Sequence, residues 1–173
     1  MSATVRPAAV PPQSEIRRSL PGAYFHDCYE MALPAEDAGF SAMELSLQTF
    51  RKTPAWVDFL MGVRNRVVGL AGLKNMGALT GVERDKPAAA YRVGNRVGIF
   101  SLRYLSEDEV ILGEDDKHLD VLVSVCKLRR GDAAAVAVTT VVHVHNWLGR
   151  CYMFFIRPAH KVIAPATLRS RTA

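Results

Sequence analysis

The feature that most constrains the fold is a change of hydrophobic period between Tyr91 and His145. Over this stretch apolar and polar residues alternate and β-branched residues are frequent, which is typical of β-strands. Polar turns at 106–108, 113–117 and 129–132 divide it into strands predicted over 97–104, 109–112, 118–128 and 133–145. Parallel strands need long crossovers, so turns this short predict an antiparallel meander.

A long helix is predicted to follow the last strand directly. Asn146 is a good N-cap for it. Apolar residues recur behind it at helical spacing: Trp147, Cys151, Phe154, Phe155, Val162 and Ile163. Pro158 removes a backbone donor and predicts a kink, and Pro165 predicts the approximate end, with a frayed Arg-rich remainder. A helix beside an antiparallel sheet buries its apolar stripe on one sheet face. We therefore expect an α+β fold with a curved antiparallel sheet packed on a long C-terminal helix.

The N-terminal half predicts one strand and two consecutive helices. The strand is expected over 23–33, before Pro34. Ser41 and Glu44 have the spacing of a capping box, which predicts a helix over 42–52. Thr53-Pro54 predicts a second helix over 53–73, followed by a loop over 74–90. Residues 1–19 carry three prolines and little aliphatic bulk, so we expect a disordered tail there and a single domain over 20–170.

Composition narrows the class of protein. The three cysteines, Cys28, Cys126 and Cys151, are scattered and make no zinc motif, which favours free thiols in a reducing compartment. The net charge is +5, but the basic residues are split between the termini and the second helix, so we expect no nucleic-acid partner. No apolar run reaches the roughly 20 residues of a membrane span, and Met1–Pro12 lacks the apolar core of a secretory signal. We expect a cytoplasmic protein.

One candidate site emerges when 118–128 and 133–145 are paired as a hairpin with Leu128 opposite Ala133. This register places His118 opposite His143, and one face then carries His118, Asp120, His143 and His145. Imidazole and carboxylate groups suit a metal or acid–base site. The alternative is the solvated polar side of the sheet, and a slip in register would scatter the cluster. The spacing matches no metal motif, and the sequence has neither a phosphate-binding glycine loop nor a nucleophile elbow, so we predict no metal and no cofactor.

Several strings of this sequence resemble a known family. They are Gly113-Glu114-Asp115-Asp116-Lys117-His118-Leu119-Asp120, His145-Asn146-Trp147-Leu148-Gly149-Arg150-Cys151-Tyr152 and Arg157-Pro158-Ala159-His160. From about Leu20 to Leu168 the chain resembles the bacterial family called domain of unknown function 2867. The resemblance implies a START-like (SRPBCC) helix-grip fold, as in polyketide cyclases and pollen-allergen-type ligand carriers. It also implies a cavity between sheet and helix for an apolar or aromatic small molecule.

Three functions remain open on this basis. The first is a binding module that holds a small hydrophobic ligand, with His118, Asp120, His143, His145, Asn146, Trp147 and Arg150 as candidate ligand-binding residues. The second is an enzyme, cyclase-like or hydrolase-like, that uses the His/Asp cluster in the same cavity. The third is a homodimeric interaction protein without a ligand, paired through the valine-rich face of the sheet.

Overall fold

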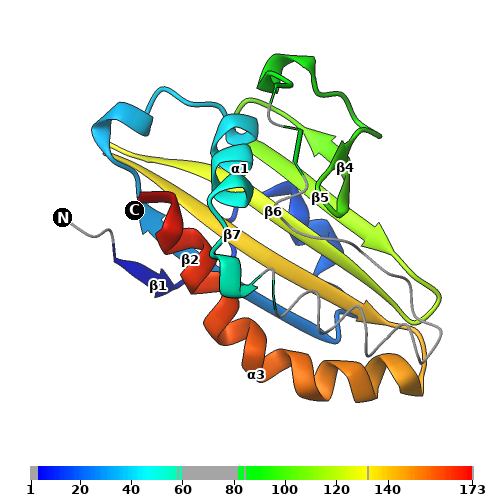
Figure 1. Ribbon diagram of the computed structural model, residues 1–173. Coiled ribbons are helices and arrows are strands. Elements are labelled where there is room, and N and C mark those ends of the chain that lie inside the picture. The colour runs from blue at the N-terminus through cyan, green and yellow to red at the C-terminus, as the bar shows by residue number, and fades with distance from the viewer. Residues whose placement is uncertain (1–3, 58, 60–81, 84, 132, 173) are drawn as a thin grey trace.

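A seven-stranded antiparallel sheet forms the centre of the protein, as a computed structural model shows (Figure 1). The structure describes residues 4–57, 59, 82–83, 85–131 and 133–172. The strands are β1 Val5–Pro7, β2 Phe25–Ala32, β3 Arg96–Val97, β4 Phe100–Leu105, β5 Glu109–Asp115, β6 Leu119–Arg130 and β7 Ala133–Val144. Their order in the sheet is β1-β2-β7-β6-β5-β4-β3. The predicted meander is therefore confirmed, and β2 pairs with β7 to extend it.

The β6–β7 hairpin has a different register from the one predicted. Leu128 lies opposite Ala135 rather than Ala133, because the turn consists of two residues instead of four. Gly131 in this turn has a φ of 62°, which glycine adopts without strain. The shift equals two residues, so every side chain keeps its predicted face while its cross-strand partner changes. Asp120, not His118, therefore lies opposite His143.

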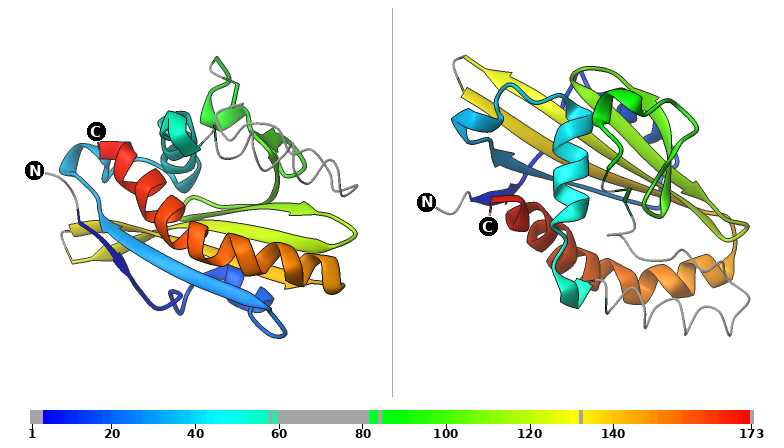
Figure 2. Two further views of the ribbon diagram at one scale, coloured as in Figure 1. Left: turned by 60° about the horizontal axis from the view of Figure 1, so that its bottom comes forward. Right: turned by 45° about the horizontal axis from the view of Figure 1, so that its top comes forward.

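Among the described residues, two α-helices cover one face of the sheet, which we call the inner face. They are α1, Ala42–Arg51, and α3, Trp147–Arg169 (Figure 2). The predicted capping box of α1 is present, since Glu44 N donates to Ser41 Oγ and Ser41 N donates to Glu44 Oε2. The fold is thus α+β with a curved sheet and a long C-terminal helix, a helix-grip-like arrangement. Of the predicted helix over 53–73 and the predicted loop over 74–90, residues 58, 60–81 and 84 lie outside the described residues.

The N-terminal segment differs from the flexible tail that we expected. Strand β1 pairs with β2, and residues 8–20 cross the opposite face of the sheet, which we call the back face. Ile16, in the short 3-10 helix η1 (Glu15–Ser19), is fully buried against Ile111 and Val141. Glu109 tethers the same segment, because it accepts hydrogen bonds from Ser14 Oγ at 2.5 Å and Glu15 N at 2.7 Å. The composition of residues 1–19 did not indicate this role, because the anchors are a single isoleucine, Ile16, and a distant carboxylate, that of Glu109.

Helix α3 also departs from expectation. It continues through Pro165 to Arg169, and Figure 1 shows that it changes direction partway along. The side chains that it buries most fully are Met153 and Leu168, whereas most of the predicted stripe faces outward. Apolar residues occupy both sides of this helix, so periodicity alone could not identify the packed side. Within the described part of the chain, no helix is both long and apolar enough to cross a membrane.

The C-terminus is anchored rather than frayed. Arg171 lies in the 3-10 helix η4 (Ser170–Thr172), and its side chain is fully buried. Its guanidinium donates to Asp37 Oδ2 at 2.7 Å and to Gln48 Oε1 at 3.1 Å. Burial lowers the pKa of Arg171, and the charge and hydrogen bond of Asp37 counteract that shift. The end of the chain is thereby fixed to the start of the domain and to α1.

Candidate functional site

The predicted His/Asp cluster forms separate pairs instead of one site. Asp120 Oδ2 lies 2.9 Å from His145 Nε2, in an ion pair that is partly exposed to solvent. His143 Nε2 lies 2.8 Å from the Ser19 carbonyl oxygen and donates to it, which holds the N-terminal segment on the back face. Among the residues that the structure describes, no three His, Cys, Asp or Glu side chains gather as a metal site requires. These contacts match the structural alternative, and they lie away from the inner face.

Two further predicted residues, His118 and Asn146, stabilise the junction between β7 and α3. Asn146 caps α3, because its Oδ1 accepts from Gly149 N at 3.1 Å. Its Nδ2 donates to Lys117 O at 3.1 Å and lies 2.9 Å from His118 Nδ1. His118 Nδ1 also lies 3.1 Å from Asn146 Oδ1, so both polar atoms of the Asn146 amide contact the imidazole. Trp147 and Arg150 project outward from the first turn, so neither lines the space beneath the helix.

Gly149 is required where α3 meets β6. A Cβ at this position would overlap His118 O, and it would lie 2.9 Å from Val144 Cγ1. We expect Gly149→Ala to lower the free energy of unfolding by about 1–3 kcal/mol, since the backbone of His118, just before β6, cannot yield as a flexible side chain would. Urea denaturation measures the change. Gly39→Ala is the matched control, because a Cβ there meets nothing within 4 Å; equal stability of the two variants would contradict the close contact.

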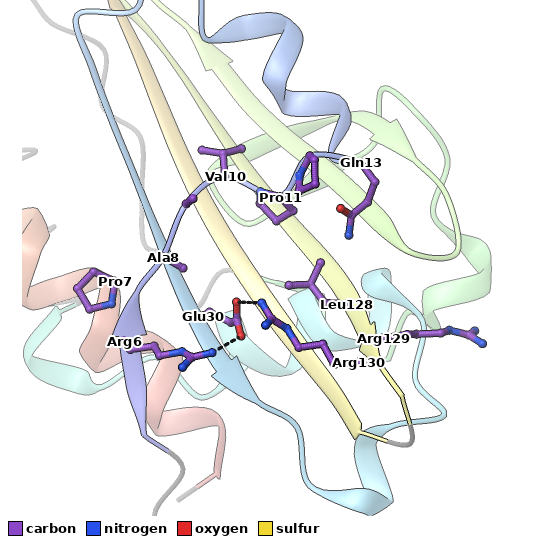
Figure 3. Close-up of a pocket in the computed structure, with 12 residues that line it drawn as sticks. Arg6, Pro7, Ala8, Val10, Pro11, Gln13, Glu30, Leu128, Arg129 and Arg130 are labelled. Atoms are coloured by element: carbon purple, nitrogen blue, oxygen red, sulfur yellow. Dashed lines mark hydrogen bonds and ion pairs between the residues drawn. The ribbon is translucent and has the colours of Figure 1, made fainter.

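A pocket of about 530 Å³ lies on the back face, between the N-terminal segment and the ends of β2 and β6 (Figure 3). Glu30 is its central group and is buried. One carboxylate oxygen accepts from Arg6 at 3.0 Å and the other from Arg130 at 2.8 Å, as the dashed lines show. Both oxygens of Glu30 are therefore satisfied from within the chain. The arrangement ties β1 to β2 and β6. Because both oxygens already accept hydrogen bonds, the Glu30 carboxylate does not require a ligand.

The inner face carries a different group of polar residues. Asp27 of β2 lies opposite Thr140 of β7, and Thr140 lies opposite Val123 of β6, so the three form one row across the sheet. His160 of α3 contacts this row from the helix side of the sheet. Its Nδ1 is 2.9 Å from Asp27 Oδ2, and its Nε2 is 3.4 Å from Thr140 Oγ1. Since the carboxylate of Asp27 can only accept, Nδ1 carries a proton and donates it to Asp27, while Nε2 faces the Thr140 hydroxyl.

The second carboxylate oxygen of Asp27 is unusual. Asp27 Oδ1 is buried, and it has no hydrogen-bond partner among the described residues. A buried oxygen of a carboxylate without a partner costs free energy that a donor would recover. Tyr29, two residues along the same face of β2, has a raised pKa, first because of its burial and second because of the charge on Asp27. The Asp27 carboxylate is therefore a local source of negative charge within a largely apolar surface.

The residues that the structure describes leave the middle of the inner face incompletely covered. Val121 and Val123 of β6 and Val138 of β7 retain partial solvent exposure, although they lie in the two central strands. Their neighbours Val125 and Val136 are only 1% exposed. The partly exposed valines adjoin the row of Asp27 and Thr140. This part of the sheet combines apolar walls with a few convergent polar groups, as small-molecule sites do.

Sequence reasoning missed Asp27, Thr140 and His160 as a group. A signal existed within β2, where Phe25, Asp27 and Tyr29 alternate onto one face and place a carboxylate on an apolar surface. Nothing local connected that carboxylate to His160, which is 133 residues away along the chain.

Comparison with known proteins places the chain in a family. No curated protein and no solved structure matches it. One family model, described as "Protein of unknown function (DUF2867)", matches residues 19–167. This range includes β2 to β7, α1 and nearly all of α3. The chain belongs to the DUF2867 family.

Proposed function

We propose that this protein binds a small, mainly apolar or aromatic molecule between the inner face of the sheet and α3. The observation that carries the proposal is the buried Asp27 Oδ1, which has no partner in the part of the chain that the structure describes, beside valines that remain partly exposed. A ligand with an apolar body and one O–H or N–H donor supplies both missing contacts. The body covers Val121, Val123 and Val138, and the donor bonds to Asp27.

The Asp27–His160 pair gives such a ligand a fixed point of attachment. His160 packs edge-on against Phe25, with ring centroids 5.7 Å apart, and the Arg157 guanidinium lies 5.6 Å from the same ring. These contacts hold the imidazole in place while it bonds to Asp27 Oδ2. The carboxylate is therefore oriented before a ligand arrives, which reduces the entropy lost on binding.

The other two hypotheses have less support. An enzyme built on His118, Asp120, His143 and His145 would need these residues at the cavity, whereas Asp120 and His143 lie on the back face. A homodimer paired through the valine-rich face would need that face exposed, whereas Val125, Val136 and Val142 pack beneath the helices. Neither observation opposes a carrier.

A pair of neutral probes tests the proposal. 2-Naphthol has an aromatic body and one hydroxyl donor, and 2-methoxynaphthalene has the same body without the donor. We expect 2-naphthol to bind at least tenfold more tightly, because a hydrogen bond to a charged group contributes about 1.5–3 kcal/mol. Fluorescence titration gives both dissociation constants.

Two variants identify the group that receives the hydroxyl. In Asp27→Leu the advantage of 2-naphthol should disappear, since the acceptor is gone. In Asp120→Leu, which removes a carboxylate from the back face, it should persist. Equal affinity of the two probes for the parent protein, or failure of both to bind, would overturn the proposal.

A further inference from the structure

Helix α3 presents a second surface, on the side that faces away from the sheet. Trp147, Phe154, Phe155 and Val162 are 72%, 74%, 71% and 62% exposed, respectively. They recur at helical spacing from Trp147 to Val162, so they form one continuous stripe about 23 Å long. Exposed aromatic residues that gather in this way mark an interaction site. We call this stripe the outer stripe.

The charged side chains that α3 itself carries are all basic. Arg150, Arg157 and Lys161 are exposed, and their spacing places them together along one flank of the stripe. Helix α3 contains no aspartate or glutamate, and none occurs anywhere after Asp132. A partner for this surface must therefore accept aromatic side chains and carry negative charge.

We propose that the outer stripe docks on an anionic lipid surface, with α3 lying in the plane of the interface. An interfacial helix has this composition, with Trp and Phe on the apolar side and Lys and Arg on the polar side. Each basic residue near an anionic leaflet adds to the attraction. A second copy of the chain fits less well, because it brings the same basic residues and no acidic residue of α3, and an antiparallel twofold contact places the Arg150, Arg157 and Lys161 rows side by side.

The aromatic pair is suited to a fluid surface. The rings of Phe154 and Phe155 contact one another edge to face, with centroids 5.2 Å apart, and both side chains are exposed. Figures 1 and 2 show their helix, α3, at the outside of the fold. Protruding rings can be buried either in a complementary groove of a protein or in a fluid medium that rearranges around them. The headgroup region of a lipid bilayer is such a medium. This docking is independent of the ligand proposed above, which contacts the opposite side of α3.

Vesicle sedimentation with the full chain tests the docking. We expect binding to vesicles of equal parts phosphatidylcholine and phosphatidylglycerol, at least tenfold weaker binding to phosphatidylcholine alone, and loss of binding in 0.5 M NaCl. The protein contains two tryptophans. In Trp56→Phe the emission reports Trp147 alone, and it should shift to shorter wavelength as anionic vesicles are added.

Matched variants separate the stripe from general basicity. Phe154→Ser with Phe155→Ser should weaken vesicle binding at least tenfold, while Val93→Ser, at another exposed apolar residue, should not. Arg150→Glu with Lys161→Glu should abolish binding, while the equal charge change Arg17→Glu with Arg18→Glu should reduce it much less. Binding that is unaffected by the phenylalanine variants, or absent from anionic vesicles, overturns the proposal. Self-association that those variants abolish, without vesicle binding, assigns the stripe to a second copy instead and also overturns it.

Discussion

Replacing Arg171 with alanine should lower the free energy of unfolding by about 3–5 kcal/mol, the usual cost of breaking a buried ion pair. The Arg171 side chain is fully buried, and its partner Asp37 is 16% exposed. Arg171→Ala leaves Asp37 and Gln48 without their donor and opens a cavity beside α1. Its effect should exceed that of any exposed arginine, because salt bridges at the surface contribute about 0–1 kcal/mol.

Chemical denaturation in urea measures this change. Arg129→Ala is the control, since Arg129 is exposed and Figure 3 shows its side chain pointing away from the pocket beside it. A second variant, Asp37→Asn, keeps the size of the partner and removes its charge, so it should destabilise the protein less than Arg171→Ala. An Arg171→Ala variant as stable as Arg129→Ala would show that the C-terminus is not anchored.

Ile16→Ala should cost about 2–5 kcal/mol, as truncation of a fully buried isoleucine does. Ile16 is 0% exposed and packs on Ile111 and Val141, so its loss weakens the attachment of the N-terminal segment to the back face. The loss of stability should approach about 5 kcal/mol, the upper end of the range for such truncations, if the segment detaches. In that case the hydrogen bonds from Ser14 and Glu15 to Glu109 are lost as well.

Two measurements distinguish attachment from a simple core effect. Urea denaturation gives the loss of stability, and limited proteolysis reports cleavage before Leu20, which should be faster in Ile16→Ala. Val93→Ala is the control, because Val93 is 61% exposed and truncation there should change stability by less than about 0.5 kcal/mol. If Ile16→Ala behaves like Val93→Ala, the N-terminal segment is the flexible tail that its composition suggests.

Local signals predicted the elements of this fold well. The alternation after Tyr91 gave the antiparallel strands, and Ser41 with Glu44 gave the start of α1, because both depend on neighbouring residues. The β6–β7 register depended on the length of a turn. Counting four residues there instead of two placed His118 opposite His143, whereas in the structure Asp120 lies opposite His143. The predicted face of each side chain was still correct, since a shift of two residues preserves alternation.

Tertiary contacts decided what the sequence left open. Ile16 is buried because the sheet offers it a back face, which no feature of residues 1–19 reveals. Helix α3 has apolar residues on two sides, and only its packing shows that Met153 faces the sheet while Phe154 and Phe155 face outward. The Asp27–His160 pair joins the first long strand to the last helix, so its two members look unrelated in the sequence.

The proposed ligand would lie over Val123, and one pair of variants tests this position directly. Val123→Phe should occupy that position, weaken 2-naphthol binding at least tenfold and change the free energy of unfolding by less than about 1 kcal/mol. Val125→Phe, two residues away on the same face but only 1% exposed, should cost about 1–3 kcal/mol through overpacking. Equal destabilisation by the two variants, or unchanged 2-naphthol affinity in Val123→Phe, would contradict the account.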